Sequence, residues 1–329
     1  MPSTDLPTYD DVALADERVR PLAIRTPLLR HDVLDAASRA SILLKSECLQ
    51  TTGSFKIRGA TNRLSQLSSA DRTVGVVAYS SGNHAQGVAR AAKHFGMPAL
   101  IVMPSDAPSI KVDGVVADGA EVRFYDRLTE SREEIAAEIA KKRGALIVPS
   151  YDDPDIIAGQ GTAGLELACE TVGTGRALDH FICCAGGGGL MAGCALAFER
   201  VSPETQLWTA EPVGFDDHKR SIETGKIQRI EPGARTICDA IMTPQPGDLT
   251  FAINKSRVSG GFAVSDDEAR AAIRFAFRHL KLVLEPGGAV ALAAALFHLP
   301  ADMKGQTVGV MLSGGNVDAA VFADILTSD

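Results

Sequence analysis

One lysine in this sequence has neighbours that could make it chemically reactive. Lys56 lies between Phe55 and Ile57, with glycines nearby at positions 53 and 59. Apolar neighbours lower the pKa of an amine, because burial disfavours its charged form. A neutral amine is a nucleophile that can form a Schiff base with a carbonyl compound. The alternative interpretation is a helix capped by Ser54, with Lys56 as an ordinary surface side chain in its first turn.

Four consecutive glycines, Gly186, Gly187, Gly188 and Gly189, follow an apolar run at residues 181–185. Glycine has no Cβ, so successive backbone N–H groups can turn toward one anion. A helix predicted to begin near Leu190 would add the positive end of its dipole. The pattern therefore predicts a phosphate-binding loop, and the alternative is a close-packed turn between a strand and a helix.

The same loop also fits a second kind of site. The spacing of Gly187, Gly189 and Ala192 matches the dinucleotide-binding fingerprint, and Glu211 ends the next predicted strand, as a ribose-binding acid does. This alternative predicts a nicotinamide-dependent oxidoreductase. This alternative assigns no role to Lys56.

Two more small, polar loops follow strand-like runs. Residues 80–84 read Ser-Ser-Gly-Asn-His after the apolar run at 74–78, and residues 313–316 read Ser-Gly-Gly-Asn after the run at 307–312. Ligands of open parallel sheets bind at the carboxyl ends of the strands. We therefore expect these loops, the glycine loop and Lys56 to form one site.

The elements that must position these residues alternate along the chain. Strands are predicted at residues 41–45, 74–79, 99–103, 121–125, 145–148, 180–185, 206–210 and 307–312. Helices are predicted at residues 55–67, 83–95, 110–118, 129–143, 154–172, 190–200, 265–280, 287–299 and 317–326. Such alternation predicts an α/β fold of mostly parallel sheets with helices on both faces.

Two domains are expected from this order. Residues 73–148 are expected to form a small domain, and residues 1–72 and 149–329 a large domain. A cleft between two such sheets is a natural active site. Residues 211–250 are rich in glycine and proline and predict loops with one short helix.

The composition is ordinary for a soluble globular protein. The chain has 329 residues, of which 45% are hydrophobic and 22% charged, and its net charge is −8, so we expect no nucleic-acid partner. Residues 1–11 lack the features of a signal peptide, and no apolar run is long enough for a membrane span. The six cysteines contain no C-x-x-C pair, so we expect them to be buried, reduced and in the cytoplasm.

In spacing and order these motifs resemble the fold-type II pyridoxal-phosphate enzymes of the threonine dehydratase and serine racemase group. The resemblance rests on five segments at residues 54–60, 81–84, 186–189, 285–288 and 313–316. It extends over essentially the whole chain, from about Pro7 onward. The fold that it implies is the two-domain, tryptophan synthase β-like arrangement. In that arrangement the large domain binds the cofactor and the small domain closes over the substrate.

The resemblance implies roles for individual residues. Lys56 would bind the cofactor and remove the Cα proton, and Ser81, on the opposite face of the ring, would be a second proton donor. The implied cofactor-binding residues are Phe55, Lys56, Asn83, Gly186, Gly187, Gly188, Gly189, Leu190, Glu285 and Ser313. Among them Phe55 packs beside the ring, Asn83 meets its phenolic oxygen and Ser313 its pyridine nitrogen. The implied substrate-binding residues are Ser80, Ser81, Gly82 and His84.

The activity implied is a lyase that converts a β-hydroxy-α-amino acid to a 2-oxo acid and ammonia. L-Threonine and L-serine are the leading substrates, with 3-hydroxyaspartate dehydratase or serine racemase as the alternative. Ser81 favours that alternative, because many threonine dehydratases have alanine there. Ala240 follows Asp239 where the family usually has glycine, which leaves the substrate open. Because members of the family are usually homodimers, the resemblance also implies a homodimer.

A metal site is also expected. Glu211 and Asp217 are hard oxygen ligands six residues apart, and the resemblance adds the backbone carbonyl of Phe215 between them. Such ligands suit Mg²⁺, or alternatively Ca²⁺ or Mn²⁺. The alternative interpretation is the acidic cap of a short helix.

Overall fold

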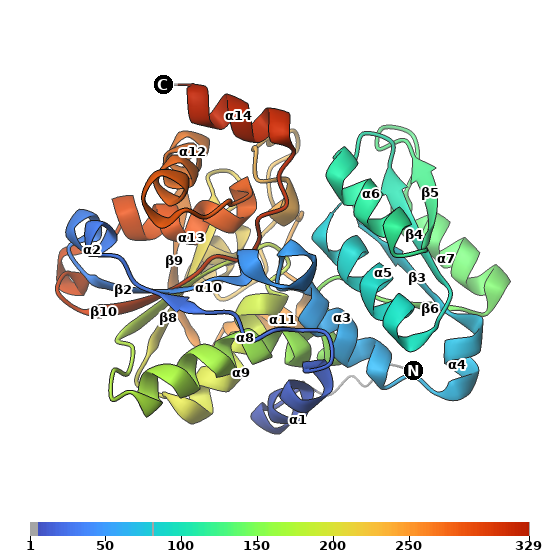
Figure 1. Cartoon of the computed structure of the whole chain (residues 1–329), viewed down its shortest axis with the longest axis horizontal. Coiled ribbons are helices and arrows are strands. Elements are labelled where there is room, and N and C mark those ends of the chain that lie inside the picture. The colour runs from blue at the N-terminus through green and yellow to red at the C-terminus, as the bar shows by residue number, and fades with distance from the viewer. Residues whose placement is uncertain (1–5, 81, 329) are drawn as a thin grey trace.

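Two β-sheets organise the chain, and Figure 1 shows them side by side. The computed structural model describes residues 6–80 and 82–328. The strands of the larger sheet are β1 (Leu28–Leu29), β2 (Ser41–Lys45), β7 (His180–Cys184), β8 (Gln206–Pro212), β9 (Val258–Val264) and β10 (Thr307–Met311). The strands of the smaller sheet are β3 (Val76–Tyr79), β4 (Ala99–Pro104), β5 (Glu121–Tyr125) and β6 (Leu146–Ile147).

The strand order is β1-β2-β10-β7-β8-β9 in one sheet and β5-β4-β3-β6 in the other. Among the described strands every pair is parallel except β1 with β2. Parallel strands bring their carboxyl ends to one edge of a sheet, which is where the predicted loops begin. The predicted α/β fold of parallel sheets with helices on both faces is confirmed.

The helices cover both faces of each sheet, as parallel connections require. They are α1 (Tyr9–Val19), α2 (Asp32–Ser38), α3 (Lys56–Ser65), α4 (Ser69–Val74), α5 (Asn83–Phe95), α6 (Ser109–Ala117), α7 (Arg132–Arg143), α8 (Pro154–Gly173), α9 (Gly189–Val201), α10 (Asp217–Thr224), α11 (Asp248–Asn254), α12 (Asp266–Phe275), α13 (Pro286–Phe297) and α14 (Ala319–Thr327). In Figure 1, α12 and α13 lie above the larger sheet, and α8 and α9 lie below it.

The core of the larger sheet explains why its central strands read as continuous apolar runs. All five residues of β7 are buried, and so are the last four of β10, because helices pack on both sides of them. On one side of the sheet, α13 is buried along ten of its residues. This rigid layer holds the loops that follow β7 and β10.

We call the segment from β3 to β6 the small lobe and the rest of the chain the large lobe. In Figure 1 the small lobe lies on the right, with α3 between the two lobes. Its strands fall within residues 76–147. The exact domain limits at 72/73 and 148/149 stay a prediction.

Several element boundaries differ from the sequence prediction. The strand expected from residue 74 begins at Val76, because α4 runs to Val74 and Gly75, at φ 92°, ends it. The segment 211–250 contains α10 and the start of a second helix, α11, that was not expected. Strand β9 was also missed, because Gly260 and Gly261 weaken its pattern. A Cβ on Gly260 would lie 2.9 Å from the ring of Trp208, so a large neighbour fills that space.

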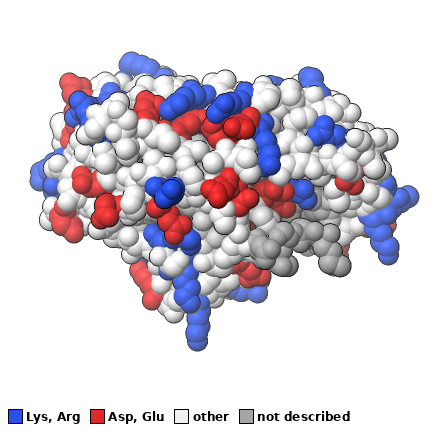
Figure 2. Space-filling view, turned by 90° about the horizontal axis from the view of Figure 1, so that it is seen from below, with Lys and Arg blue, Asp and Glu red and all other residues white. Residues whose placement is uncertain are grey.

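The cysteine prediction is partly wrong. Among the described residues all six are free thiols, but Cys169 is exposed on α8 and Cys48 is only half-buried. In the same part of the chain, no helix combines the length and the apolar character that crossing a membrane requires. On the face in Figure 2, acidic and basic side chains are interspersed.

Candidate active site

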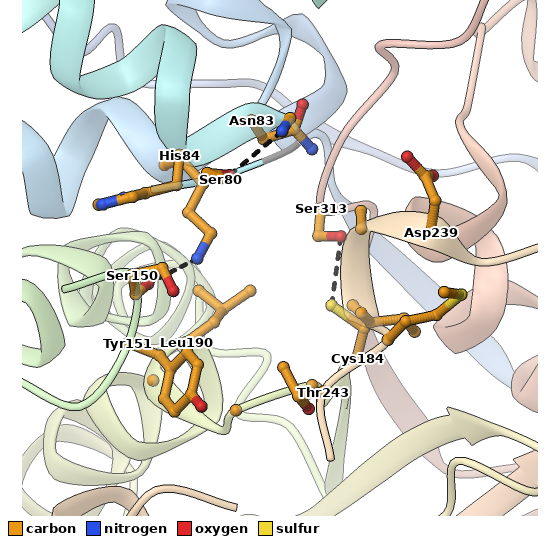
Figure 3. A pocket seen from close by; sticks show the side chains of 18 of the residues that line it. Ser80, Asn83, His84, Ser150, Tyr151, Cys184, Leu190, Asp239, Thr243 and Ser313 are labelled. Carbon is orange, nitrogen blue, oxygen red and sulfur yellow. Dashed lines mark hydrogen bonds between the residues drawn. The ribbon is translucent and has the colours of Figure 1, made fainter. Parts of the chain in front are cut away.

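A pocket between the two lobes gathers most of the predicted site residues (Figure 3). The predicted residues that line it are Phe55, Lys56, Ser80, Gly82, Asn83, His84, Gly186, Gly187, Gly188, Gly189, Leu190, Glu285 and Ser313. Ser81 lies outside the described residues. Glu211, Phe215 and Asp217 are not part of the pocket wall and form a separate group.

Lys56 is the first residue of α3, and its side chain extends into the pocket. The ammonium nitrogen Nζ donates a hydrogen bond to the backbone oxygen of Ser150 over 2.6 Å, and it lies 5.3 Å from the centre of the Phe55 ring. Burial lowers the pKa of Lys56 to about 8. The amine is therefore much closer to its nucleophilic form at neutral pH than an exposed lysine is.

Backbone pairing fixes the start of α3 against the loop after β10. Ser54 forms an isolated bridge with Gly314, and the N–H of Phe55 donates to the carbonyl of Ser313 over 3.2 Å. The N–H of Gly315 in turn donates to the carbonyl of Gly53 over 2.9 Å. These bonds set the position of Lys56 relative to Ser313, although the two residues are far apart in sequence.

The hydroxyl of Ser313 has a partner that the sequence did not reveal. The thiol of Cys184, at the end of β7, donates to Ser313 Oγ over 3.2 Å, and both residues line the pocket (Figure 3). With its oxygen accepting from the thiol, the hydroxyl can direct its own proton into the pocket. A ring nitrogen is a suitable acceptor there.

A polar network lies beside this hydroxyl. The amide of Asn83 donates to a carboxylate oxygen of Glu285, and the amide of Asn316 donates to Asn83 Oδ1 over 2.8 Å. Asn316 also donates to Gln86 over 2.9 Å. Burial raises the pKa of Glu285, and Lys111 opposes that effect. Asn83 is thus held by neighbours on two sides, with its second amide hydrogen left for a ligand.

His84 is a buried anchor of the small lobe. Its Nε2 donates to the backbone oxygen of Val148 over 3.0 Å, since a carbonyl can only accept. Burial, with the nearby charge of Lys56, lowers the pKa of His84 to about 3, so the ring is neutral and Nδ1 carries no proton. We therefore expect any contact of His84 with a substrate carboxylate to be made by its backbone N–H.

The glycine loop has the form of an anion cradle. The N–H groups of Gly186, Gly187 and Gly188 donate to no acceptor among the described residues, and Gly189 begins α9. A Cβ on Gly187 would lie 2.2 Å from the ring of Tyr151, so a side chain could not fit there. Gly188 has φ 91°, which favours glycine. These donors at a helix N-terminus fit a phosphate group.

The loop is held from behind by polar contacts. The hydroxyl of Thr250 donates to the carbonyl of Gly187 over 2.6 Å, and the N–H of Gly247 donates to the same oxygen over 3.2 Å. The carboxylate of Asp152 accepts three N–H bonds at the start of α11. Because the carbonyl of Gly187 binds these two donors behind the loop, its orientation leaves the loop N–H groups free to face the pocket.

Taken together, the site has an amine of lowered pKa, a phosphate cradle and a hydroxyl suited to a ring nitrogen. These are the groups that pyridoxal phosphate needs: a lysine for its aldehyde, donors for its phosphate and a partner for its pyridine. The residues present therefore fit this cofactor. On parallel sheets with helices on both faces, such a site defines a fold-type II pyridoxal-phosphate enzyme.

The comparisons with known proteins agree with this class. Residues 19–314 match the family model described as pyridoxal-phosphate dependent enzyme. The chain is 46% identical to an L-threo-3-hydroxyaspartate ammonia-lyase from a Pseudomonas species, over 98% of this chain and 99% of that one. It is 42% identical to a serine racemase from Schizosaccharomyces pombe, over 98% of both. A solved serine racemase from maize is 36% identical and superposes with a TM-score of 0.91, over 97% of both chains.

The chain belongs to the pyridoxal-phosphate dependent enzyme family. The predicted resemblance to the threonine dehydratase and serine racemase group is confirmed, and so is the prediction of an ammonia-lyase type of enzyme. The dinucleotide alternative finds no support. Glu211 lies away from the pocket, and its two carboxylate oxygens accept from the backbone N–H groups of His218 and Lys219 over 2.9 and 2.8 Å.

Sequence reasoning missed several residues that line the pocket. They are Tyr79, Arg127, Arg132, Ser150, Tyr151, Gln160, Cys184, Ile241, Met242 and Thr243. Asp239 and Ala240 also line the pocket, and the sequence marked them only as a departure from the family pattern. Gln160 lies inside α8, and the others lie in loops or at element ends, with no motif of their own. Only the fold brings them to the site.

The predicted metal ligands are buried but only partly available. Glu211 is 0% exposed and Asp217 1% exposed, and Asp217 Oδ2 has no hydrogen-bond partner within the described residues. Burial raises the pKa of Asp217 to about 7, and burial with the charge of Asp217 raises that of Glu211. Across the described chain no group of three or more ligating side chains gathers. Two carboxylates with one orphan oxygen are nevertheless chemically suited to a hard cation.

Proposed function

We propose that this enzyme is a pyridoxal-phosphate dependent ammonia-lyase for β-hydroxy-α-amino acids, with 3-hydroxyaspartate as its preferred substrate. The observation that supports this substrate is a guanidinium in the wall of the pocket that contains Lys56. Arg132, at the start of α7, lines the pocket with Lys56 and the glycine loop. L-Threonine and L-serine have no second carboxylate for such a group to bind.

Arg132 is available for a ligand. Its Nε donates to Glu133 over 2.8 Å, whereas its two terminal nitrogens have no hydrogen-bond partner in the described part of the chain. The guanidinium lies over the ring of Tyr79, 5.6 Å from its centre, which orients the planar group. A guanidinium recognises a carboxylate through two parallel hydrogen bonds. The relative with 46% identity is named for L-threo-3-hydroxyaspartate, which carries that carboxylate.

The bound cofactor supplies an electron sink that makes bonds at the substrate Cα easier to break. Lys56 would act as the base that takes the Cα proton. The backbone around Ser80, Gly82 and His84, at the N-terminus of α5, would hold the α-carboxylate. The β-hydroxyl would leave as water, and hydrolysis of the resulting enamine would give a 2-oxo acid and ammonia.

The neighbours of Lys56 would keep this proton transfer in place. Ser150 accepts from the amine and would retain it near the pocket when it is not bonded elsewhere. Ser313, oriented by Cys184, would offer a neutral hydroxyl to the ring nitrogen. Such a partner keeps the ring a moderate electron sink, which suits rapid loss of a β-hydroxyl. Ser81 would be the proton donor of a racemase side activity.

A product assay tests this function. Purified protein is given L-threo-3-hydroxyaspartate, its erythro isomer, L-threonine, L-serine or D-serine, and 2-oxo acid and ammonia are measured. We expect the largest kcat/KM with a hydroxyaspartate isomer, and no turnover by Lys56→Ala with any substrate. A larger kcat/KM with L-threonine or L-serine would overturn the substrate, and absence of turnover with all of them would overturn the lyase.

We further infer a Mg²⁺ site at Glu211 and Asp217, completed by the carbonyl of Phe215. This inference is supported by Asp217 Oδ2, which has no hydrogen-bond partner among the described residues and lies near the buried carboxylate of Glu211. Two buried anions need a compensating cation. Ca²⁺ or Mn²⁺ would suit the same oxygens. This site would be structural or activating, because it lies outside the pocket.

We also infer a cytoplasmic homodimer. The six cysteines are free thiols, which supports the reducing environment of the cytoplasm. The homodimer is inferred because members of the group that the sequence resembles are usually homodimers. Sedimentation of the purified holoenzyme tests the assembly, with a mass of 34.6 kDa overturning it.

A further inference from the structure

Lys111 is a buried cation that the proposed reaction does not use. It lies in the first turn of α6 in the small lobe and is 1% exposed. Its Nζ is 2.8 Å from Asp239 Oδ2 and 3.3 Å from Glu285 Oε2, and both carboxylates belong to the large lobe. Asp239 and Glu285 also line the active-site pocket. The ion pairs therefore cross the boundary between the lobes beside the site.

The side chain of Lys111 also supports the predicted carboxylate loop. A Cβ built on Gly82 would lie 3.1 Å from both Cδ and Nζ of Lys111, so the lysine packs directly against the backbone of that loop. Glu285, which forms an ion pair with Lys111, also accepts a hydrogen bond from Asn83 in the next position of the loop. One cation thus contacts the backbone of the substrate loop and also binds the carboxylate that holds Asn83.

The ion pair with Asp239 connects Lys111 to the glycine loop that is predicted to bind the cofactor. Asp239 begins a 3₁₀ turn that ends at Ile241, and a Cβ on Gly186 would lie 3.1 Å from Ile241 Cα. The turn is therefore packed against the glycine loop. Without the ammonium, Asp239 and Glu285 would repel each other, since the charge of Asp239 raises the pKa of Glu285. Lys111 outweighs this repulsion and keeps both carboxylates at the pocket wall.

We propose that Lys111 is a positioning residue that fastens the small lobe over the site and couples the substrate-carboxylate loop to the cofactor loop. Burying an ammonium costs free energy, and among the described residues the ion pairs with Asp239 and Glu285 offset that cost. The pairing therefore favours the arrangement in which the two lobes are in contact. This inference rests on the proposed function only in calling the loop at residues 80–84 the carboxylate loop.

The test compares Lys111→Met, which keeps the stem and removes the charge, with Lys111→Arg, which keeps the charge. Lys93→Met is the matched control. Lys93 pairs with Asp118 over 3.2 Å, but both residues lie in the small lobe, so no pair across the boundary is lost. Asp239→Asn weakens the pairing from the other lobe, at a side chain that is 37% exposed.

The first readout is amide hydrogen exchange of the holoenzyme without substrate. We expect Lys111→Met and Asp239→Asn to speed exchange at least about tenfold in residues 82–90 and 238–242, with Lys111→Arg closer to wild type. The second readout is kinetic. We expect KM for the amino acid to rise about tenfold, with kcat changed less than about threefold, because closure adds to substrate binding.

Lys93→Met should leave both readouts unchanged. The proposal is overturned if Lys111→Met and Asp239→Asn both show the exchange and KM of the Lys93 control. Hydrogen exchange is measured without substrate, so it tests the role of Lys111 even if the enzyme turns over none of the amino acids. Absence of turnover would then contradict the proposed function without affecting the test of Lys111.

Discussion

The Nζ of Lys56 donates to the carbonyl oxygen of Ser150 over 2.6 Å, so the amine of the large lobe is held by the segment that follows β6. A carbonyl accepts from a charged and from a neutral amine alike. The bond therefore positions the nitrogen without fixing its protonation state. Burial supplies the preference for the neutral form, and it brings the pKa of Lys56 to about 8.

The rate at which apoprotein takes up pyridoxal phosphate should rise with pH, with a midpoint near the lowered pKa of Lys56, about 8. Below that value the amine is mostly protonated, so the rate should fall about tenfold for each pH unit. Stopped-flow absorbance across the range from about pH 6 to about pH 10 measures it. A midpoint above about 10, the ordinary pKa of lysine, would show that burial does not lower the pKa of Lys56.

Alanine at Gly187 should weaken cofactor binding by about 10- to 100-fold, because the added methyl meets the Tyr151 ring at 2.2 Å. Overpacking of this kind costs about 1–3 kcal/mol. Gly173→Ala is the control, since nothing lies within 4 Å of its Cβ position at the end of α8. Equilibrium titration of apoprotein with cofactor compares them, and equal affinity of the two variants would contradict the cradle.

The Arg132→Met variant should lose activity toward 3-hydroxyaspartate much more than toward L-serine. We expect kcat/KM for 3-hydroxyaspartate to fall about 10- to 100-fold, the effect of losing a charged hydrogen bond of about 1.5–3 kcal/mol. The value for L-serine should change less than about threefold. Arg123→Met, on exposed β5 and paired with Glu130, is the control. Equal losses for both substrates would assign Arg132 to structure rather than to substrate recognition.

Magnesium should raise the melting temperature, and more strongly above the pKa of Asp217 than below it. That pKa in the folded protein is about 7, above its ordinary value of 3.8. Without a cation, stability therefore falls as the pH rises from about 4 to about 7, because the folded state holds its proton longer than the unfolded state does. Mg²⁺ binds the ionised form and should offset this loss.

Calorimetry with and without Mg²⁺ measures the effect, and a concentration about 100 times Kd corresponds to about 2.7 kcal/mol. Asp217→Asn should abolish the shift. A shift that persists in this variant would place the ion elsewhere.

The fold could be read from the sequence because local patterns agree with burial. The strands β7 and β10 are apolar nearly throughout, since helices cover both faces. Helix α8 begins where its sequence indicates, with Asp153 as cap and Pro154 in the first turn. Strand β9 could not be read, because Trp208 on the neighbouring strand, rather than its own side chains, fills the space above Gly260.

The site could be predicted only where its residues share a motif. Lys56, Asn83 and the glycine loop lie in short runs of unusual composition. Arg132 and Lys111 are single basic residues in ordinary helices, and no local pattern separates them from surface charge. Their positions result from packing between the lobes, which depends on the whole fold.

The place of β10 in the larger sheet has a consequence for synthesis. This strand, at residues 307–311, lies between β2 and β7, so the sheet lacks a central strand until that late segment has left the ribosome. Until then the nascent chain exposes two apolar strand edges that invite aggregation. The loops after β7 and β10, which form part of the pocket, can therefore come together only after β10 has been synthesised.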